Sequence, residues 1–292
     1  MDILTKAVTA DKLVRIYAVN SKNTVSEAQK IHFTSPVITA ALGRTLTGGI
    51  LMGAMQKDEN ADITIQIKGG GPAGLILAVA KHDGFVKGYV ENPYLDLPLN
   101  SKGKLDVGTA VGREGYLSVV KDLKLKEPYI GRVPIQTGEI GDDLAFYFAQ
   151  SEQIPGAVAL GVLVDRNLSV KAAGGFIVQV MPDCDEFTLK RLEKAVSDIT
   201  SVTDLLSEGM SSEELIKYVM KDFDIEILES KEVGYRCDCS RERTQNAVKS
   251  LAKEEIQSIL DEEGQAEVTC HFCNKAYVFD KICLEKMLSE KS

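Results

Sequence analysis

Short runs of alternating apolar and polar residues fill most of positions 1–181, and this period of two predicts a sheet. The predicted strands span 7–10, 14–19, 62–68, 75–80, 85–90, 112–126, 129–136, 158–164, 168–173 and 174–181. Capping residues and apolar spacing predict helices over 25–32, 36–55 and 141–152. A sheet with a few helices places this part of the chain in the α+β class.

The helix predicted over 36–55 is made largely of small residues. Ser35 is a good capping residue, and Pro36 suits the first helical turn. Ala, Gly and Thr dominate positions 39–49. Because small side chains let another element approach closely, we expect this helix to be buried against the sheet.

Positions 185–220 change to the spacing of amphipathic helices. Apolar residues recur at three- and four-residue intervals from Phe187 to Leu206, and Ser211 begins a further helix that ends near Met220. One interpretation is an ordinary helical connector. The other is that these helices are marginally stable alone and depend on neighbours for burial.

The cysteines define a further, C-terminal part of the chain. Cys237 and Cys239 form one close pair, and Cys270 and Cys273 form another. Two thiols from each of two tight turns complete the tetrahedral thiolate set of a zinc ion, so we predict a zinc site. Around it we expect helices over 241–251 and 253–263, strands at 267–269 and 275–279, and a final helix capped by Asp280.

We therefore predict three parts: an α+β core domain at 1–181, a helical linker at 182–232 and a small zinc-binding domain at 233–292. A domain of about sixty residues has little core. Structural zinc contributes roughly 10–16 kcal/mol of apparent binding free energy, whereas whole domains are stable by about 5–15 kcal/mol. Loss of zinc is expected to unfold the last domain. Oxidation could cause that loss, since each thiol pair could close on itself and remove its ligands.

Charge and composition argue against two kinds of partner, membranes and nucleic acids. No apolar run approaches the roughly 18 residues of a membrane span, and the N-terminus lacks a signal-peptide pattern, so we expect a cytoplasmic protein without membrane contact. Residues 1–181 hold 19 Lys and Arg against 18 Asp and Glu, whereas residues 182–292 hold 15 against 25. The metal-bearing part is thus acidic, and we expect no nucleic-acid partner.

Other residues that could carry chemistry have simpler structural interpretations. Residues 69–74 match the Gly-x-Gly-x-x-Gly pattern, but Pro72 and the strand-like residues after it favour a tight turn over a dinucleotide loop. Capping of a helix explains Asp142 and Asp143. The remaining Cys and His residues are interpreted as small apolar (Cys184, Cys283), surface (His271) and structural or exposed (His32, His82). A closed thiolate site leaves no position for water, so we predict that the protein is not an enzyme.

Several segments besides the two cysteine pairs form a combination that extends over essentially the whole chain. They are Gly-Gly-Gly-Pro at 69–72, Gly-Lys-Leu-Asp at 103–106, Ser-Val-Val-Lys-Asp at 118–122, Gly-Glu-Ile-Gly-Asp-Asp at 138–143, Ala-Gly-Gly-Phe at 173–176 and Gly-Gln-Ala-Glu at 264–267. In combination they resemble the heat-shock protein 33 family of redox-regulated chaperones.

This resemblance implies a holdase that works without ATP and binds unfolding client proteins, commonly as a homodimer when active. In that family the reduced, zinc-bound form is inactive, and oxidative stress with unfolding forms disulfides, releases zinc and disorders the linker. Carried over, one zinc ion is held by Cys237, Cys239, Cys270 and Cys273 in the reduced state, and the disulfides are Cys237–Cys239 and Cys270–Cys273.

Two alternatives use the same residues differently. A constitutive zinc-ribbon regulatory or interaction protein would explain the four cysteines, with Arg236, Arg241 and Arg243 as contacts to a partner. A small-molecule enzyme in the N-terminal domain would rest on the glycine-rich turn alone.

Overall fold

The computed structural model describes residues 1–124 and 126–291, and the chain divides into two compact units. Unit 1 comprises residues 1–236 and unit 2 comprises residues 237–292. A large sheet with helices confirms the predicted α+β class. The finer division at 181/182 and 232/233 stays a prediction.

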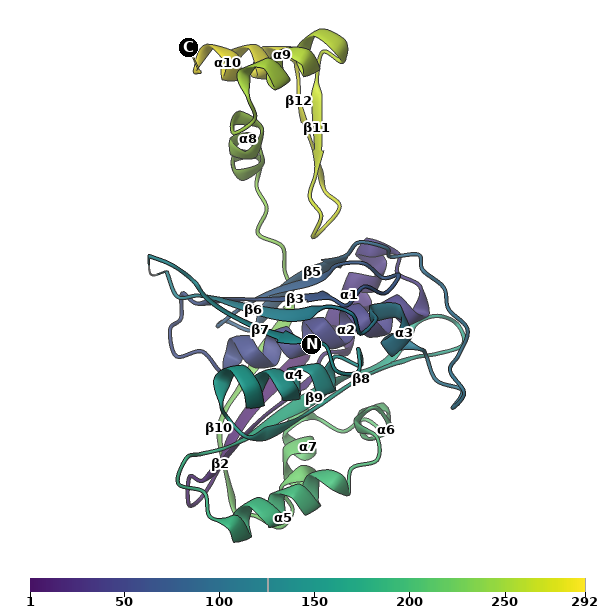
Figure 1. Ribbon diagram of the computed structural model, residues 1–292, viewed down its shortest axis with the longest axis vertical. Coiled ribbons are helices and arrows are strands. Elements are labelled where there is room, and N and C mark those ends of the chain that lie inside the picture. Colours follow the sequence, from purple (N-terminus) through teal and green to yellow (C-terminus); the bar gives the residue numbers. More distant parts are fainter. Residues whose placement is uncertain (125, 292) are drawn as a thin grey trace. The chain divides into compact units, whose positions relative to one another are not determined.

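Unit 1 is built on a ten-stranded sheet whose order is β7-β6-β3-β4-β5-β10-β1-β2-β9-β8 (Figure 1). The strands are β1 (Asp2–Thr9), β2 (Val14–Asn20), β3 (Asp62–Lys68), β4 (Ile76–Lys81), β5 (Phe85–Val90), β6 (Tyr116–Asp122), β7 (Tyr129–Pro134), β8 (Gly156–Val164), β9 (Val170–Val180) and β10 (Ile225–Tyr235). Neighbouring strands are antiparallel except β10 and β5, which are parallel and joined through Gly234 opposite Phe85 and Tyr235 opposite Val86. This short seam divides the sheet into two halves.

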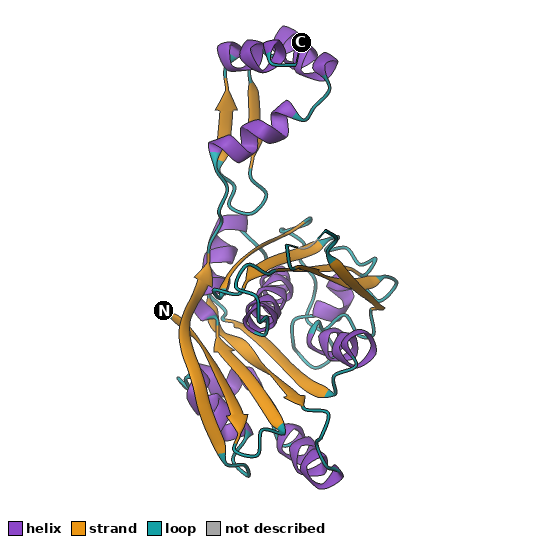
Figure 2. Ribbon diagram, turned by 90° about the vertical axis from the view of Figure 1, so that its left-hand side faces the viewer, coloured by secondary structure: helices purple, strands orange, loops and turns teal. Residues whose placement is uncertain are grey.

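The halves of the sheet lie on either side of α2 (Pro36–Ala54), which runs through the middle of the unit (Figure 2). The Ser35 hydroxyl accepts a hydrogen bond from the Ile38 amide, and every residue of α2 except Pro36 and Arg44 is buried. The expected burial of this helix against the sheet is therefore confirmed. Its length and hydropathy would suit a membrane span, but 94% of that window is buried inside the fold, as in a core helix.

Small residues on α2 determine how closely each half of the sheet can pack against this helix. A Cβ built on Gly49 would already touch Ala78, Ala80 and Val86 of one half. A Cβ on Gly43 would lie 2.8 Å from Val162 of the other half, which is too close for any real contact. The glycines thus allow two sheet faces to pack on a single helix.

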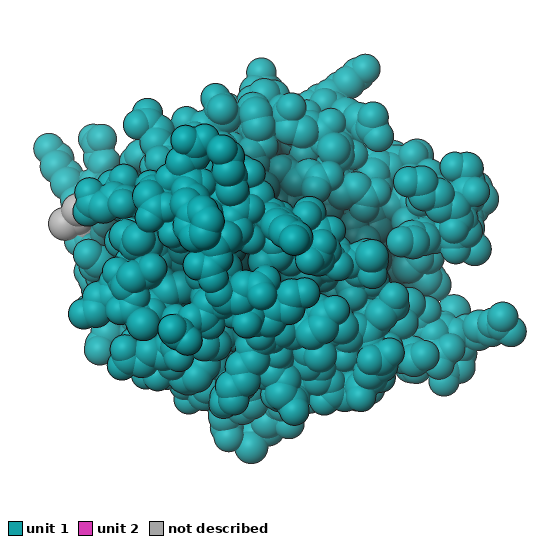
Figure 3. All heavy atoms as spheres, turned by 90° about the horizontal axis from the view of Figure 1, so that it is seen from below, with its two compact units in different colours: residues 1–236 teal, residues 237–292 magenta. Residues whose placement is uncertain are grey.

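The remaining helices of unit 1 lie at the periphery (Figures 1 and 2). They are α1 (Lys22–His32), α3 (Val107–Val111), α4 (Gly141–Tyr147), which continues as a π-helical turn η1 (Phe148–Glu152), α5 (Glu186–Ser197), α6 (Val202–Ser207) and α7 (Ser212–Val219). Figure 3 shows this unit from the end at which α5 lies in Figure 1.

Helices α5, α6 and α7 cover the sheet face opposite to α2. Strands β2 and β9 alternate, so that Ile16 and Phe176 point to these helices while Val19 and Ile177 point to α2. The helices add a single apolar layer to that face: Leu192, Val202, Leu206, Leu215, Ile216 and Val219. Each is capped by a side chain at its start, from Asp185, Ser201 and Ser211 respectively.

Several predicted boundaries differ from the structure. The first strand begins at Asp2 rather than position 7, and the strands predicted at 168–173 and 174–181 form one strand, β9. The strand predicted over 112–126 is shorter, since β6 starts at Tyr116, and residue 125 lies outside the described residues. Helix α3 and strand β10 were not predicted.

Candidate metal centre

Unit 2 is a small scaffold around a β-hairpin (Figure 1). Its elements are α8 (Arg241–Lys249), α9 (Lys253–Glu262), β11 (Ala266–Thr269), β12 (Ala276–Phe279) and α10 (Lys281–Ser289). The expected helices, strands and Asp280 cap are confirmed, and the Asp280 carboxylate accepts from the Cys283 amide at 2.9 Å. Among residues 237–291, its core holds eight buried residues: Val248, Ile256, Ala266, Tyr277, Phe279, Leu284, Met287 and Leu288. A core of this size contributes little to the stability of the unit.

The second cysteine pair lies in the turn that joins β11 to β12. The Cys270 amide donates to the Lys275 carbonyl at 3.0 Å, and the Cys270 carbonyl accepts from the amides of Cys273 (3.3 Å) and Asn274 (2.8 Å). Asn274 has a φ of +55°, a conformation that Asn tolerates well. The turn holds both thiols on one tight backbone loop.

The first cysteine pair lies just before α8. Ser240 follows Cys239 and caps this helix by accepting from the Arg243 amide at 3.1 Å. The Arg243 guanidinium reaches back to the carboxylate of Asp238, at 2.9 Å, and to its carbonyl. A helix start and a cross-link between Arg243 and Asp238 therefore fix the residue between the two thiols.

The four sulfurs meet at one point. Their Sγ atoms all lie within 4.8 Å of one another, with 3.7 Å between Cys237 and Cys270 and 3.4 Å between Cys239 and Cys273. Four sulfurs at about 2.3 Å from a tetrahedral zinc ion would be about 3.8 Å apart, whereas a disulfide needs about 2.0 Å. All four cysteines are free and half-buried. The residue set and its spacing fit a tetrahedral thiolate metal site.

Tyr277 is an additional member of this site. Its side chain is only 6% exposed, and its hydroxyl donates a hydrogen bond to Cys239 Sγ at 3.1 Å. That bond raises the pKa of Tyr277 to about 12. Burial tends to raise the pKa of Cys239, but the hydrogen bonds from Tyr277 and the neighbouring thiols outweigh it, and its pKa falls to about 7. A thiol that ionises this readily is a good metal ligand.

Two other thiols of the cluster have raised pKa values, in contrast to Cys239. Burial is the main cause that raises the pKa of Cys237, and it also raises the pKa of Cys273. Ionisation is thus disfavoured at Cys237 and Cys273 and favoured at Cys239. A divalent cation would remove this imbalance, because it stabilises every thiolate at once.

Sequence reasoning did not find Tyr277. Its only signal was an aromatic residue four positions after Cys273 in an alternating strand, a place that core packing explains equally well. The hairpin register, in which Tyr277 pairs with Val268, turns its hydroxyl toward the cluster.

The other cysteines and His271 lie outside this cluster. Cys283 packs against the core of unit 2, and Cys184 packs against the apolar layer under α5–α7. Burial raises the pKa of the Cys184 thiol, which fits a small apolar residue. His271 is exposed, and its ring nitrogens are not among the four clustered ligand atoms.

The remaining histidines and Asp143 have structural surroundings. His32 is buried, with Nε2 at 2.9 Å from the Gly88 carbonyl, and His82 is half-buried. The Asp143 carboxylate is fully buried and accepts from the amides of Gln136, Thr137 and Ile140 at 2.7–3.0 Å. It organises the loop before α4.

The glycine-rich segment 69–74 is a structural turn. It is followed by strand β4 rather than a helix, and its amides are used internally: Gly71 donates to the Val111 carbonyl and Ala73 to the Ala110 carbonyl, both at 2.9 Å. A Cβ on Gly71 would lie 2.5 Å from backbone atoms of residues 110–112. These glycines therefore serve close backbone packing, and the amides are not directed at a phosphate.

Comparison with known proteins shows which family this chain is similar to. The family model described as "Hsp33 protein" matches residues 2–280. The 33 kDa chaperonin of Caldanaerobacter subterraneus subsp. tengcongensis is 50% identical over 289 residues, covering 99% of this chain and 98% of that protein. The 33 kDa chaperonin of Clostridium botulinum strain Langeland is 49% identical over 294 residues, covering 99% of both.

A solved structure agrees with the same assignment. The crystal structure of the 33 kDa chaperonin (heat shock protein 33 homolog) from Thermotoga maritima superposes with a TM-score of 0.91 at 38% identity, covering 99% of this chain and 98% of that one. A matching fold, a match along nearly the whole sequence and a clustered set of four thiols lead to one conclusion: the chain belongs to the Hsp33 family of chaperones.

Proposed function

We propose that this protein is a redox-regulated holdase, which binds unfolding client proteins under oxidative stress without using ATP. The observation that carries the proposal is the cluster of four free thiols, two from each of two tight loops, in a unit whose described residues include eight buried core residues. Family membership supports chaperone activity. The cluster supports a switch, because its metal ligands are also its oxidisable groups.

In the reduced state, Cys237, Cys239, Cys270 and Cys273 would hold one zinc ion as thiolates. The ion would supply the cross-link that the small core lacks, and the protein would be inactive. Tyr277 would keep Cys239 ionised and oriented. A closed thiolate site offers no open position for substrate, in keeping with a binding protein rather than an enzyme.

In the oxidised state, disulfides Cys237–Cys239 and Cys270–Cys273 would replace the four thiolates. Each disulfide takes one peroxide: two thiolates and H₂O₂ give one S–S bond and two hydroxide ions, with sulfur oxidised and the peroxide oxygens reduced. Two peroxides would thus release the zinc ion. Because cross-loop sulfur pairs are also close, at 3.4 and 3.7 Å, peptide mapping is needed to distinguish the two pairings.

Helices α5, α6 and α7 are the elements we expect to respond. They are short, and their apolar residues gain burial chiefly against β2 and β9. Their undocking would uncover Ile16, Phe176 and Val178, which are at most 1% exposed in the folded protein. An apolar sheet face of this kind is what an unfolding client could bind.

The experiment is to follow zinc, thiols and client together. Reduced protein is treated with peroxide at a mildly elevated temperature, released zinc is measured with a chromogenic chelator, and free thiols are counted. Light scattering of an unfolding client reports chaperone activity. We expect loss of one zinc and four thiols together with suppressed aggregation, and sedimentation analysis should show a dimer in the active form.

Matched variants make the test specific. Cys184→Ser removes a thiol outside the cluster and should leave the amount of zinc released by peroxide unchanged. Cys270→Ser should release zinc without peroxide. If the wild-type protein keeps its zinc, or suppresses aggregation equally when reduced, the redox switch is rejected.

The alternative of a constitutive zinc-ribbon interaction protein has less support. Arg243 is paired with Asp238, and Arg241 stacks on the Phe279 ring at 4.7 Å. Arg236 stacks on Phe85 and pairs with Asp83. The three cations proposed for a nucleic-acid or protein partner thus have intramolecular contacts. Salt-dependent DNA or RNA binding by the reduced protein would favour this alternative.

A further inference from the structure

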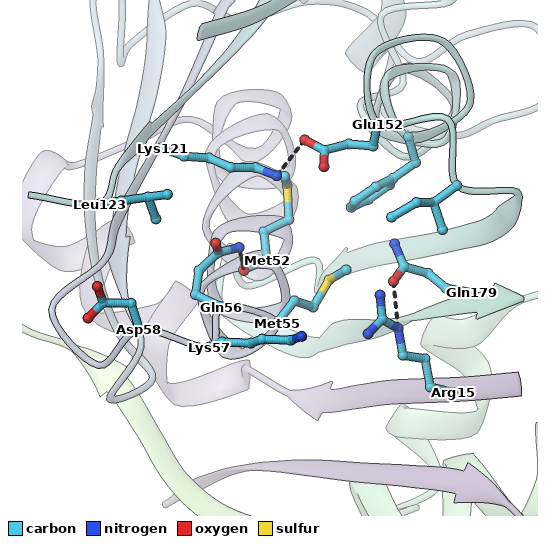
Figure 4. Close-up of a pocket in the computed structure, with 12 residues that line it drawn as sticks. Arg15, Met52, Met55, Gln56, Lys57, Asp58, Lys121, Leu123, Glu152 and Gln179 are labelled. Atoms are coloured by element: carbon cyan, nitrogen blue, oxygen red, sulfur yellow. Dashed lines mark hydrogen bonds and ion pairs between the residues drawn. The ribbon is translucent and has the colours of Figure 1, made fainter. Parts of the chain in front are cut away.

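Unit 1 holds a cavity of about 300 Å³ at the C-terminal end of α2 (Figure 4). Its walls come from both halves of the sheet: Arg15 of β2 and Gln179 of β9 on one side, Lys121 of β6 on the other. Met52 and Met55 reach into it from the end of α2. This volume lies at the small end of the range for ligand sites in proteins.

Gln179 presents an unused donor to this cavity. The residue is 1% exposed, and its Oε1 accepts from Arg15 Nε at 3.0 Å, which fixes the orientation of the amide. Its Nε2 is buried and has no hydrogen-bond partner among the described residues. Figure 4 shows this nitrogen directed into the cavity, away from Arg15. A buried amide donor is costly to leave unpaired, so the site calls for an acceptor.

The charges around the cavity favour an anionic acceptor. Lys121 is neutralised by Glu152 at 2.5 Å. Arg15 and Lys57 have no carboxylate within ion-pair distance among the described parts of the chain. The Asp58 carboxylate also borders the cavity and accepts from the Asn60 amide. Arg15, Lys57 and Asp58 together therefore leave a net charge of +1 around the same space as the Gln179 amide.

The rest of the wall is apolar. Met52 is buried and Met55 half-buried, and Leu123, Phe148 and Ile154 complete this surface. Methionine side chains adapt their shape to flexible apolar ligands. One side of the cavity thus offers donors and positive charge, and the other offers a deformable apolar lining.

We propose that this cavity binds a medium-chain monocarboxylate, with the carboxylate at Gln179, Arg15 and Lys57 and the alkyl chain along Met52 and Met55. A volume of about 300 Å³ equals about ten waters at roughly 30 Å³ each, which matches about ten non-hydrogen atoms. Octanoate has this size, and it is a suitable ligand for the test.

The experiment uses the full reduced, zinc-loaded chain with ¹³C-methyl-labelled methionine. Titration with octanoate should shift the methyl signals of Met52 and Met55 and leave that of Met287, in the core of unit 2, unchanged. We expect saturation with a dissociation constant of about 1 mM or tighter. Octylammonium, which has the same chain and the opposite charge, should bind at least about tenfold more weakly.

Two variants test the roles of the Gln179 amide donor and of the Lys57 cation in octanoate binding. Gln179→Met keeps the side-chain volume and removes the amide, and it should weaken octanoate binding at least about tenfold. Gln136→Met makes the same change at an exposed position and should have no effect. Lys57→Gln, on the surface, should weaken binding about threefold at low salt and less at high salt.

Three results would overturn the proposal. They are Met52 and Met55 signals that do not move, equal binding of octanoate and octylammonium, and equal affinities of the Gln179→Met and Gln136→Met proteins. A parallel shift of Met287 would show detergent-like association instead. If Gln179→Met does not fold, the salt-dependent loss in Lys57→Gln decides between the outcomes.

Discussion

The hydrogen bond from Tyr277 to Cys239 predicts a measurable loss of metal affinity when it is removed. In Tyr277→Phe the ring stays in the core of unit 2 and only the hydroxyl that lies 3.1 Å from Cys239 Sγ is lost. Loss of an outer hydrogen bond to a metal ligand typically costs about 10–100-fold in metal affinity. Because sulfur is a weak acceptor and this is a single bond, we expect about tenfold.

The assay is competition for zinc between the reduced protein and a chromogenic chelator, in the absence of oxygen. Tyr218→Phe is the matched control, because Tyr218 is 44% exposed on α7 in unit 1. Peroxide should also release zinc faster from Tyr277→Phe, since a thiolate that accepts one hydrogen bond fewer is more nucleophilic. A zinc affinity for Tyr277→Phe within twofold of the wild type would refute the reasoning, whatever the protein does as a chaperone.

Three further predictions concern stability. Removal of zinc by a chelator should abolish amide protection from hydrogen exchange in residues 237–291, while unit 1 stays protected. The reason is that domains of this size are stable by only about 3–8 kcal/mol, whereas zinc binding contributes roughly 10–16 kcal/mol. Persistent protection of β11 and β12 after complete zinc loss would contradict this. Gly71→Ala should destabilise unit 1 by about 2 kcal/mol and lower its melting temperature by about 5 °C, because the new Cβ meets backbone atoms at 2.5 Å; Gly141→Ala, whose Cβ finds ordinary contacts at 3.7 Å, should change the melting temperature by much less. The Glu229 carboxylate lies 2.7 Å from Lys6, and this bond lowers its pKa, so the pair stabilises the protein above the unfolded pKa of about 4.3 and loses this effect as the pH falls through the folded pKa. Glu229→Gln should therefore cost about 0.3–0.5 kcal/mol in urea unfolding at pH 7, and progressively less as the pH falls below about 4.

Local patterns in the sequence predicted the elements whose causes are local. Ser35 and Pro36 located the start of α2, and the alternating segments located β3, β4 and β5. The two cysteine pairs were expected to converge, and they do, because each pair is held by its own turn. The ligand role of these thiols and their pairing on oxidation stay predictions.

The missed elements depend on contacts distant in sequence. Strand β10 holds three Glu and one Lys and looks unlike a central strand, yet it lies between β1 and β5. Its charged residues are tolerated because they pair across strands, as Glu229 does with Lys6. Helix α3 has only five residues, too few to show a helical period. The contact of Tyr277 with the cysteine cluster depends on the register of the β11–β12 hairpin, which the sequence does not reveal.

The place of β10 in the chain has a mechanical consequence. The pairing that joins the two halves of the sheet uses the last residues of this strand, Gly234 and Tyr235, and the Arg236 amide adds one bond to the Val86 carbonyl at 2.9 Å. Cys237 follows immediately. If β10 separates from the sheet starting at Cys237, its hydrogen bonds to β5 would break first. Its pairing with β1, from Val233 back to Ile225, would break only afterwards. If Cys237 holds a metal ion as proposed, release of that ion would therefore first affect the continuity of the ten-stranded sheet.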